Sequence, residues 1–196
     1  MLRSDNIYSL PKELPIPVDD GACKHLVGMN LPSILLKSTS GNWVDLSQQK
    51  GITVIYCYPR MGMPDKEPLN GWNLIPGARG CTPQSCAFRD RYSDYKKSNI
   101  IIFGLSVQDT EYQKEAVDRL HLPFDILSDE QLLFVNALNL PTFQVEGMIF
   151  IKRLTLAVED GVIKKVFYPI FPADKNPEEV LKWLGENYPN RFENVS

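Results

Sequence analysis

The sequence lacks several features that would assign its class directly. Its 196 residues include only four cysteines and two histidines, too few cysteines for the disulfide framework of a secreted scaffold. It has no apolar stretch long enough to cross a membrane and no run of lysine and arginine of the kind that binds nucleic acid. The first residues, Met1–Asn6, contain no apolar segment, so we expect no signal peptide. We therefore expect a cytoplasmic protein with neither membrane nor nucleic-acid partners.

The remaining composition is typical of a globular chain, with 43% apolar residues, 23% charged residues and a net charge of −3. A chain of this length predicts a single domain over residues 1–196. Several prolines and an Asp-Asp-Gly turn signal predict an irregular N-terminal arm over residues 1–30. Cys23 and His25 lie in this arm, but two such residues are too few to hold zinc, so we interpret them as bystanders.

The order of the apolar segments predicts an α/β fold with a mixed central sheet and helices on both of its faces. Segments rich in β-branched and aromatic residues are the expected strands, at 34–36, 43–46, 53–58, 99–107, 124–127, 148–151, 154–158 and 162–168. Segments with apolar residues at helical spacing are the expected helices, from 82 onward, at 110–120, at 130–138 and from 176 onward. Cys57 lies inside an expected strand and is predicted to be a small core residue.

Residues 59–80 form an unusual segment, because four prolines and several glycines deny it regular structure. A loop of this length is uncommon in a compact domain unless it covers a site or mediates association. It leads directly into Cys81 and contains Trp72. We therefore predict that it forms a wall or lid of an active site.

A helix is predicted to begin at the end of this loop. Thr82 is a good N-cap residue, and Pro83 suits the first helical position, where a missing N–H has no cost. Phe88, Tyr92 and Tyr95 then recur at the spacing of one apolar helical face.

Two cysteines occupy the start of this helix, Cys81 at its threshold and Cys86 five positions later. The positive end of the helix should make the Cys81 thiol easier to deprotonate than a free cysteine. Cys86 lies about 140° around the helix and about 7.5 Å along it, on the side shared with Arg89 and Asp90. A disulfide needs Cα atoms within about 4.4–6.8 Å. The pair can therefore bond only if the first turn unwinds, which predicts a redox switch.

The segment from Gly80 to Asp90, which reads Gly-Cys-Thr-Pro-Gln-Ser-Cys-Ala-Phe-Arg-Asp, resembles the active-site helix of the Q-type peroxiredoxins, also called bacterioferritin comigratory protein. In that family a peroxidatic cysteine is followed five residues later by a resolving cysteine, within a Gly-Cys-Thr-x-x-(Ala/Ser)-Cys-x-Phe-Arg-Asp run. Residues 54–59, 99–107 and 122–129 resemble the family's strands around the site. The likeness covers roughly residues 30–185 and implies a thioredoxin-like fold with N-terminal additions.

The resemblance implies a thiol peroxidase that needs no metal or organic cofactor. Cys81 would reduce hydrogen peroxide or an organic hydroperoxide and become a sulfenic acid, and Cys86 would then form a disulfide with it. Thioredoxin or a similar dithiol would reduce that bond, and the protein could be a monomer or a homodimer. The family's arginine near the thiolate matches Arg153, with Arg79 as a rival because it is close to Cys81 in the sequence.

The chain departs from the family pattern in the loop before the cysteine, which normally reads Pro-x-x-x-(Thr/Ser)-x-x-Cys. Here Ala78 stands where the hydroxyl residue belongs and Leu74 where the proline belongs. Pro59 follows the strand as the family's proline does, but a long insertion separates it from Cys81. Pro76 is a second candidate to shield the site.

Three alternatives remain beside the peroxidase. A thioredoxin-like thiol–disulfide oxidoreductase without peroxidase activity usually carries Cys-x-x-Cys, so the longer spacing counts against it. A metal-binding or copper-delivery protein needs a further ligand, and His121 is the only histidine downstream of the cysteine pair. Two inert thiols are the third alternative, which the polar neighbours of Cys86 disfavour.

Overall fold

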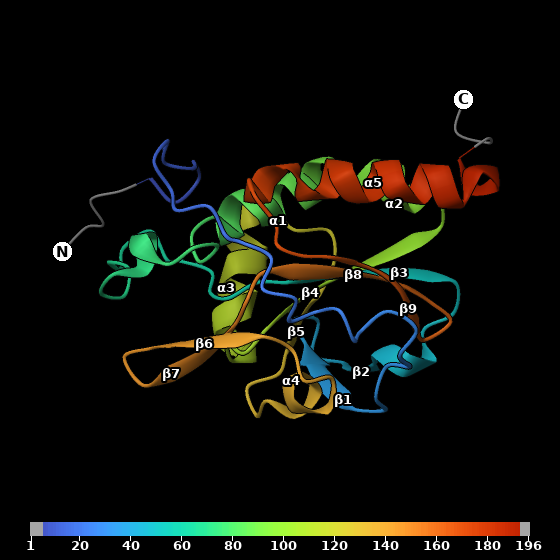
Figure 1. The fold of residues 1–196 in the computed structure, drawn as a ribbon, viewed down its shortest axis with the longest axis horizontal. Helices are drawn as coiled ribbons and strands as arrows, with labels where there is room; N and C mark the ends of the chain where they lie inside the picture. Colours follow the sequence, from blue (N-terminus) through green and yellow to red (C-terminus); the bar gives the residue numbers. More distant parts are fainter. Residues whose placement is uncertain (1–5, 193–196) are drawn as a thin grey trace.

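The computed structural model describes residues 6–192, and its main element is a seven-stranded mixed sheet (Figure 1). The strands lie side by side in the order β2 (Trp43–Asp45), β1 (Leu35–Ser38), β5 (Ile126–Ser128), β4 (Ile100–Ser106), β3 (Ile52–Cys57), β8 (Leu154–Glu159) and β9 (Val162–Phe167). β3, β4 and β5 run parallel, while β8 is antiparallel to β3. The predicted mixed sheet is confirmed.

The central strand β3 is buried along its whole length, as its unbroken apolar sequence predicts. Because successive side chains point to opposite faces of a sheet, Val54 and Tyr56 enter one core cluster while Ile55 and Cys57 enter another. Cys57 is therefore a buried core residue, as predicted.

Helices cover both faces of the sheet, as predicted. The core cluster on one face includes residues of α1 (Cys81–Asp90), α2 (Tyr92–Lys97), α3 (Thr110–Leu120) and α5 (Asn176–Asn187). The cluster on the other face includes residues of α4 (Leu133–Ala137) and of the N-terminal arm. Figure 1 shows α2 and α5 on one side of the sheet and α4 on the opposite side. Short 3-10 turns complete the regular structure, at η1 (Leu46–Gln48), η2 (Trp72–Leu74), η3 (Ala173–Lys175) and η4 (Pro189–Arg191).

Two predicted helices differ in extent from the structure. The helix expected from residue 82 onward is divided into α1 and α2 at Arg91, where the backbone leaves helical geometry (φ −97°, ψ 2°). The helix expected at 130–138 begins only at Leu133, because Leu132 has a left-handed backbone (φ 58°). The carboxylate of Asp129 accepts hydrogen bonds from the backbone N–H groups of Phe134 and Val135 and so caps the shortened helix.

One strand was not predicted at all. β6 (Thr142–Val145) pairs with β7 (Met148–Ile151) in a separate two-stranded sheet. The turn between them uses positive φ at Glu146 and Gly147, which is the conformation of a tight hairpin. β6 is only four residues long and two of these are exposed, so its sequence gives a weak strand signal.

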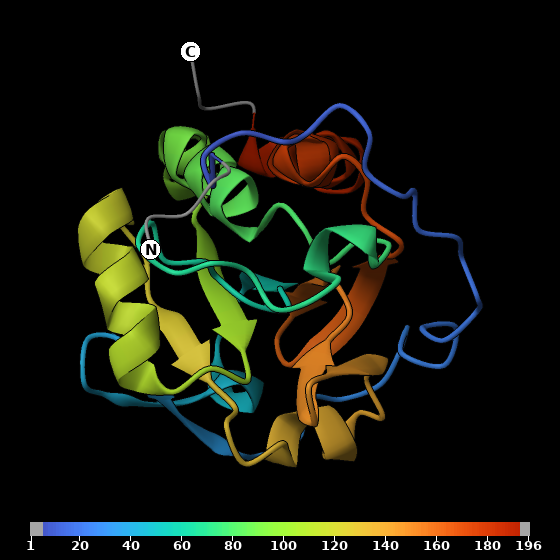
Figure 2. The same ribbon diagram turned by 90° about the vertical axis from the view of Figure 1, so that its left-hand side faces the viewer.

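The described part of the arm, residues 6–30, has no helix and no strand beyond an isolated bridge between Asn30 and Val162. The arm, blue in Figure 2, runs around the outside of the sheet. Cys23 and Leu26 nevertheless enter the core cluster on the α4 face. The prediction of one domain over residues 1–196 includes residues outside the described range and stays a prediction. Within residues 6–192, no helix has the length and hydropathy needed to span a membrane.

Candidate active site

Helix α1 begins at Cys81 itself, with Gly80 as its N-cap. The prediction that Thr82 caps the helix and Pro83 opens it is wrong by two positions. Gly80 has a left-handed backbone (φ 114°), and a Cβ there would lie 2.9 Å from side-chain carbons of Leu10 and Ala173. Glycine avoids both contacts and tolerates this backbone, so the helix starts two residues earlier than a cap at Thr82 would allow. Pro83 still falls among the first helical positions, whose N–H groups have no intrahelical partner.

Arg153, between β7 and β8, is the arginine that reaches the Cys81 sulfur. Its Nη2 donates a hydrogen bond to Cys81 Sγ at 3.2 Å, and both side chains are only 3% exposed. The Cys81 thiol can in turn donate to the backbone carbonyl of Ala78 at 3.7 Å. The structure thus brings together two of the residues predicted for the site, although they are far apart in the sequence.

The Arg153 guanidinium is held by neutral acceptors. It donates to the backbone carbonyls of Gly77, Ala78 and Arg79 at 3.2–3.3 Å, and to Oε1 of Gln84. Among residues 6–192, no carboxylate forms an ion pair with it. A buried cation without a counter-charge is unfavourable, and the Cys81 sulfur lies within hydrogen-bond distance of this one.

Arg79, the rival candidate, lies in the same region with a different orientation. It lines the pocket beside Cys81, and its Nη2 donates to the backbone carbonyl of Asn6 in the N-terminal arm at 2.6 Å. Arg79 therefore ties the arm to the loop before α1. The hydrogen bond to the sulfur comes from Arg153.

A pocket with a cavity volume of about 40 Å³ opens beside Cys81. Most of its lining residues belong to the 59–80 loop, so the loop forms a wall of this pocket. That the pocket is an active site stays a prediction. Trp72 of the loop is buried against Phe143 and Phe150, with ring centroids 5.8 and 5.2 Å away. The unpredicted β6–β7 hairpin is therefore the support on which the loop rests.

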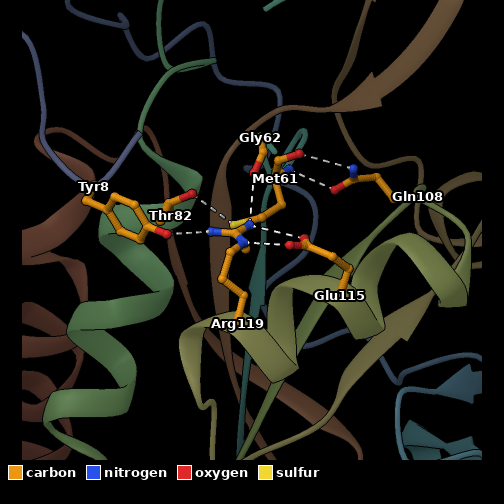
Figure 3. Close-up of polar contacts among 7 residues, drawn as sticks. All are labelled: Tyr8, Met61, Gly62, Thr82, Gln108, Glu115 and Arg119. Atoms are coloured by element: carbon orange, nitrogen blue, oxygen red, sulfur yellow. Dashed lines mark hydrogen bonds and ion pairs between the residues drawn. The ribbon is translucent and has the colours of Figure 1, made fainter. Parts of the chain in front are cut away.

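Polar contacts also fix the first residues of this loop (Figure 3). The side-chain amide of Gln108 binds both backbone groups of Met61, with its Oε1 accepting from the N–H at 2.7 Å and its Nε2 donating to the carbonyl at 3.3 Å. Arg119 donates to the carbonyl of Gly62 at 3.0 Å while paired with Glu115 at 2.6 Å. These contacts hold the loop against α3 and the end of β4.

Thr82 adds a link from helix α1 to the same loop (Figure 3). Its hydroxyl donates to the sulfur of Met61 at 3.3 Å. Thioether sulfur is a weak acceptor, so the Thr82 hydroxyl, next to Cys81 in the sequence, makes only a weak hydrogen bond.

Comparison with known proteins adds to this geometry. The family model described as Redoxin matches residues 26–182. Peroxiredoxin Q of Sedum lineare, named as chloroplastic, is 32% identical over 158 residues, which are 80% of this chain and 76% of that protein. The chain belongs to the Q-type peroxiredoxins. The Populus jackii relative of the same name is 31% identical over 80% of this chain and 67% of its own length.

Solved structures agree with this peroxiredoxin in fold. Peroxidoxin BcpB from Mycobacterium tuberculosis has a TM-score of 0.67 at 21% identity, over 82% of this chain and 96% of that one. A mutant of Xylella fastidiosa PrxQ has the same TM-score at 17% identity, also over 82% and 96%. These similarities confirm the predicted thioredoxin-like peroxiredoxin fold.

Cys86 of this peroxiredoxin lies on the same continuous helix as Cys81, and both thiols are free. It is half-buried and packs against the core cluster that contains Phe88, so the polar surroundings predicted for it are only part of its environment. Burial raises the pKa of the Cys86 thiol, an effect that Arg89 partly offsets.

The other cysteines of the peroxiredoxin are buried in the core cluster on the α4 face. Burial raises the pKa of Cys57 and raises that of Cys23 to about 12. The Nε2 of His25 is 2.9 Å from the backbone carbonyl of Leu138. Within residues 6–192 there is no group of three or more His, Cys, Asp or Glu side chains that could hold a metal ion.

Ala78, which replaces the family's hydroxyl residue, is fully buried and contributes its backbone carbonyl to Arg153. Sequence reasoning missed three polar residues in the same region, Gln84, Thr155 and Asn176. Asn176 is the first residue of α5, where the helix was predicted to begin, and its side chain binds Gln84 and Thr155. The signal that could have found Gln84 is its place one turn after Cys81, where a side chain lies above the helix start.

Proposed function

We propose that this chain is a thiol-dependent peroxidase in which Cys81 is the peroxidatic residue. The observation that carries the proposal is the 3.2 Å hydrogen bond from Arg153 to the Cys81 sulfur at the start of α1, beside a small pocket. The thiolate attacks one oxygen of the peroxide, and the O–O bond breaks. Sulfur keeps that oxygen as a sulfenic acid, while the other oxygen takes up a proton and leaves as water or an alcohol.

Arg153 has two functions in this step. Its charge stabilises the thiolate, and its N–H groups stabilise the negative charge that develops on the peroxide oxygens as their bond breaks. The neutral acceptors around it keep the guanidinium fixed without neutralising it. Family membership supports the peroxide substrate.

The size of the pocket favours small substrates. A cavity of about 40 Å³ has space for a molecule the size of hydrogen peroxide. An organic hydroperoxide would place its O–O group in the pocket and its organic part toward the rim of the 59–80 loop. Both substrates are reduced by the same attack.

The second step joins Cys86 to Cys81. The Cys86 sulfur attacks the sulfenic sulfur, the S–O bond breaks, and the hydroxyl leaves as water with one proton. Since α1 holds the two residues about 7.5 Å apart along its axis, the first turn must unwind first. A dithiol of the thioredoxin type then reduces the disulfide, taking over its two oxidising equivalents.

The family assignment does not favour the alternative, a thiol–disulfide oxidoreductase without peroxidase activity. The geometry also argues against it, because a sulfur that is 3% exposed is poorly placed to attack a protein disulfide directly. A cytoplasmic location is part of the proposal, as is a monomer or homodimer.

Removal of each cysteine tests the mechanism. Cys81→Ser is expected to abolish peroxide consumption with a dithiol reductant. Cys86→Ser is expected to give one rapid turnover and then stop with a sulfenic acid at position 81. Mass spectrometry of the unaltered protein after one equivalent of peroxide should show a Cys81–Cys86 crosslink with Cys23 and Cys57 reduced. Full activity in Cys81→Ser would refute the proposal.

A further inference from the structure

A buried chain of hydrogen bonds connects helix α5 to the start of α1. Arg153 Nη1 donates to Oε1 of Gln84, and Gln84 Nε2 donates to Oδ1 of Asn176 at 3.0 Å. Thr155 Oγ1 donates to the same Asn176 oxygen at 2.7 Å. All four side chains are buried, and they come from α1, β8, the β7–β8 connection and the first residue of α5.

The direction of this chain is fixed by its chemistry. Arginine can only donate, so the Gln84 amide must present its oxygen to Arg153 and its NH₂ group to Asn176. Asn176 must then present its oxygen, which leaves its own NH₂ group buried without a hydrogen-bond partner among residues 6–192. An unpaired buried donor lowers the stability of the fold. The contribution of Asn176 to stability therefore does not explain why an asparagine occupies this position.

Gln84 also closes the first turn of α1, since its backbone N–H donates to the carbonyl of Gly80 at 3.0 Å. A disulfide between Cys81 and Cys86 requires that turn to open. When it opens, the Gln84 side chain must leave both Arg153 and Asn176. The same contacts that fix the guanidinium beside the sulfur therefore oppose the unwinding.

We propose that Asn176 is a positioning residue that acts through Gln84 and sets the balance between the two chemical steps. Anchoring Gln84 holds Arg153 in place for peroxide attack and delays disulfide formation. The proposal rests on the proposed peroxidase function. Asn176 exchanges no proton and no electron in it.

Asn176→Ala removes the anchor without touching Cys81, Cys86, Arg153 or Gln84. Stopped-flow fluorescence and rapid acid quench should show peroxide attack slowed roughly threefold and disulfide formation accelerated roughly tenfold, as expected for the loss of one buried hydrogen bond on the helix turn. In excess peroxide the yield of Cys81 sulfinic acid should fall, because the sulfenic acid is consumed faster. Thr155→Val loses only the second bond to Asn176 and should shift both rates the same way by a smaller factor.

Val180→Ala is the matched control, because Val180 is a fully buried residue of α5 outside the hydrogen-bond chain. It destabilises α5 and should leave the ratio of the two rates unchanged. Equal acceleration of disulfide formation in Val180→Ala and Asn176→Ala would overturn the inference. So would rate constants for peroxide attack and disulfide formation within twofold of the unaltered protein in both Asn176→Ala and Thr155→Val. Failure of the unaltered protein to form a sulfenic acid at Cys81 would instead refute the proposed function.

Discussion

Replacement of Arg153 by lysine tests the electrostatic part of the mechanism most directly. Lysine keeps the positive charge, but its single ammonium group has three donors on one atom. Arg153 makes five contacts from three nitrogens: three backbone carbonyls, Gln84 and the Cys81 sulfur. A lysine cannot reach all of them, and the bond to the sulfur depends on the planar shape of the guanidinium.

The magnitude follows from the contacts that are lost. A hydrogen bond to a charged group contributes about 1.5–3 kcal/mol, which corresponds to a decrease of about 10- to 150-fold in the rate constant for peroxide attack. The same change leaves buried carbonyls without donors, at about 1–3 kcal/mol each in the free energy of unfolding. We therefore expect Arg153→Lys to be both slower and less stable.

Stopped-flow measurement of the first turnover gives the rate constant, and urea unfolding gives the stability. Arg79→Lys serves as the control, since the Arg79 guanidinium binds the arm at Asn6. A rate for Arg153→Lys within twofold of the unaltered protein would refute the reasoning. So would a larger rate decrease in Arg79→Lys than in Arg153→Lys.

Three further predictions follow from other features of the molecule. Trp72→Ala should lower the free energy of unfolding by about 3–5 kcal/mol, as for other large core truncations, and an unchanged urea midpoint would contradict the anchoring role of Trp72. Gly80→Ala should lower the Tm by several degrees, because a Cβ at φ 114° would contact Leu10 and Ala173; a Tm equal to that of the unaltered protein would show that the arm and η3 yield freely. Hydrogen bonds from Lys152 and Tyr168 lower the pKa of Asp20 to about 2 from 3.8, so the carboxylate stabilises the fold above pH 3.8 and this contribution is lost as the pH falls toward 2. Asp20→Asn should therefore weaken the acid dependence of stability in this range, and identical acid unfolding curves would exclude the linkage.

Local sequence patterns were sufficient to predict most of the sheet and the position of the cysteine pair. The unbroken apolar run of β3 and the apolar segments at 154–158 and 162–168 depend on neighbours in the sequence, and these predicted strands are confirmed. Resemblance to a known family correctly gave the fold and pointed to Arg153. Its hydrogen bond to Cys81 agrees with that indication, while the catalytic roles of these residues stay predictions.

The features that sequence reasoning missed depend on contacts between distant segments. Gly80 caps α1 because Leu10 and Ala173 occupy the space beside it, and Thr82, the better local cap, is not used. β6 forms because it pairs with β7 and supports Trp72. No local pattern around Asn176 indicates that its side chain meets Gln84.

The N-terminal arm contributes residues to the start of α1 that lie outside the family match. The family match starts at residue 26, whereas Asn6 binds Arg79 and Leu10 packs over the glycine that opens α1. A chain shortened to the matched region would keep every strand of the sheet and both cysteines of the pair, but it would lose the residues that cover the start of α1. The residues that make up the matched fold and the residues that enclose the Cys81 pocket are thus different sets in this molecule.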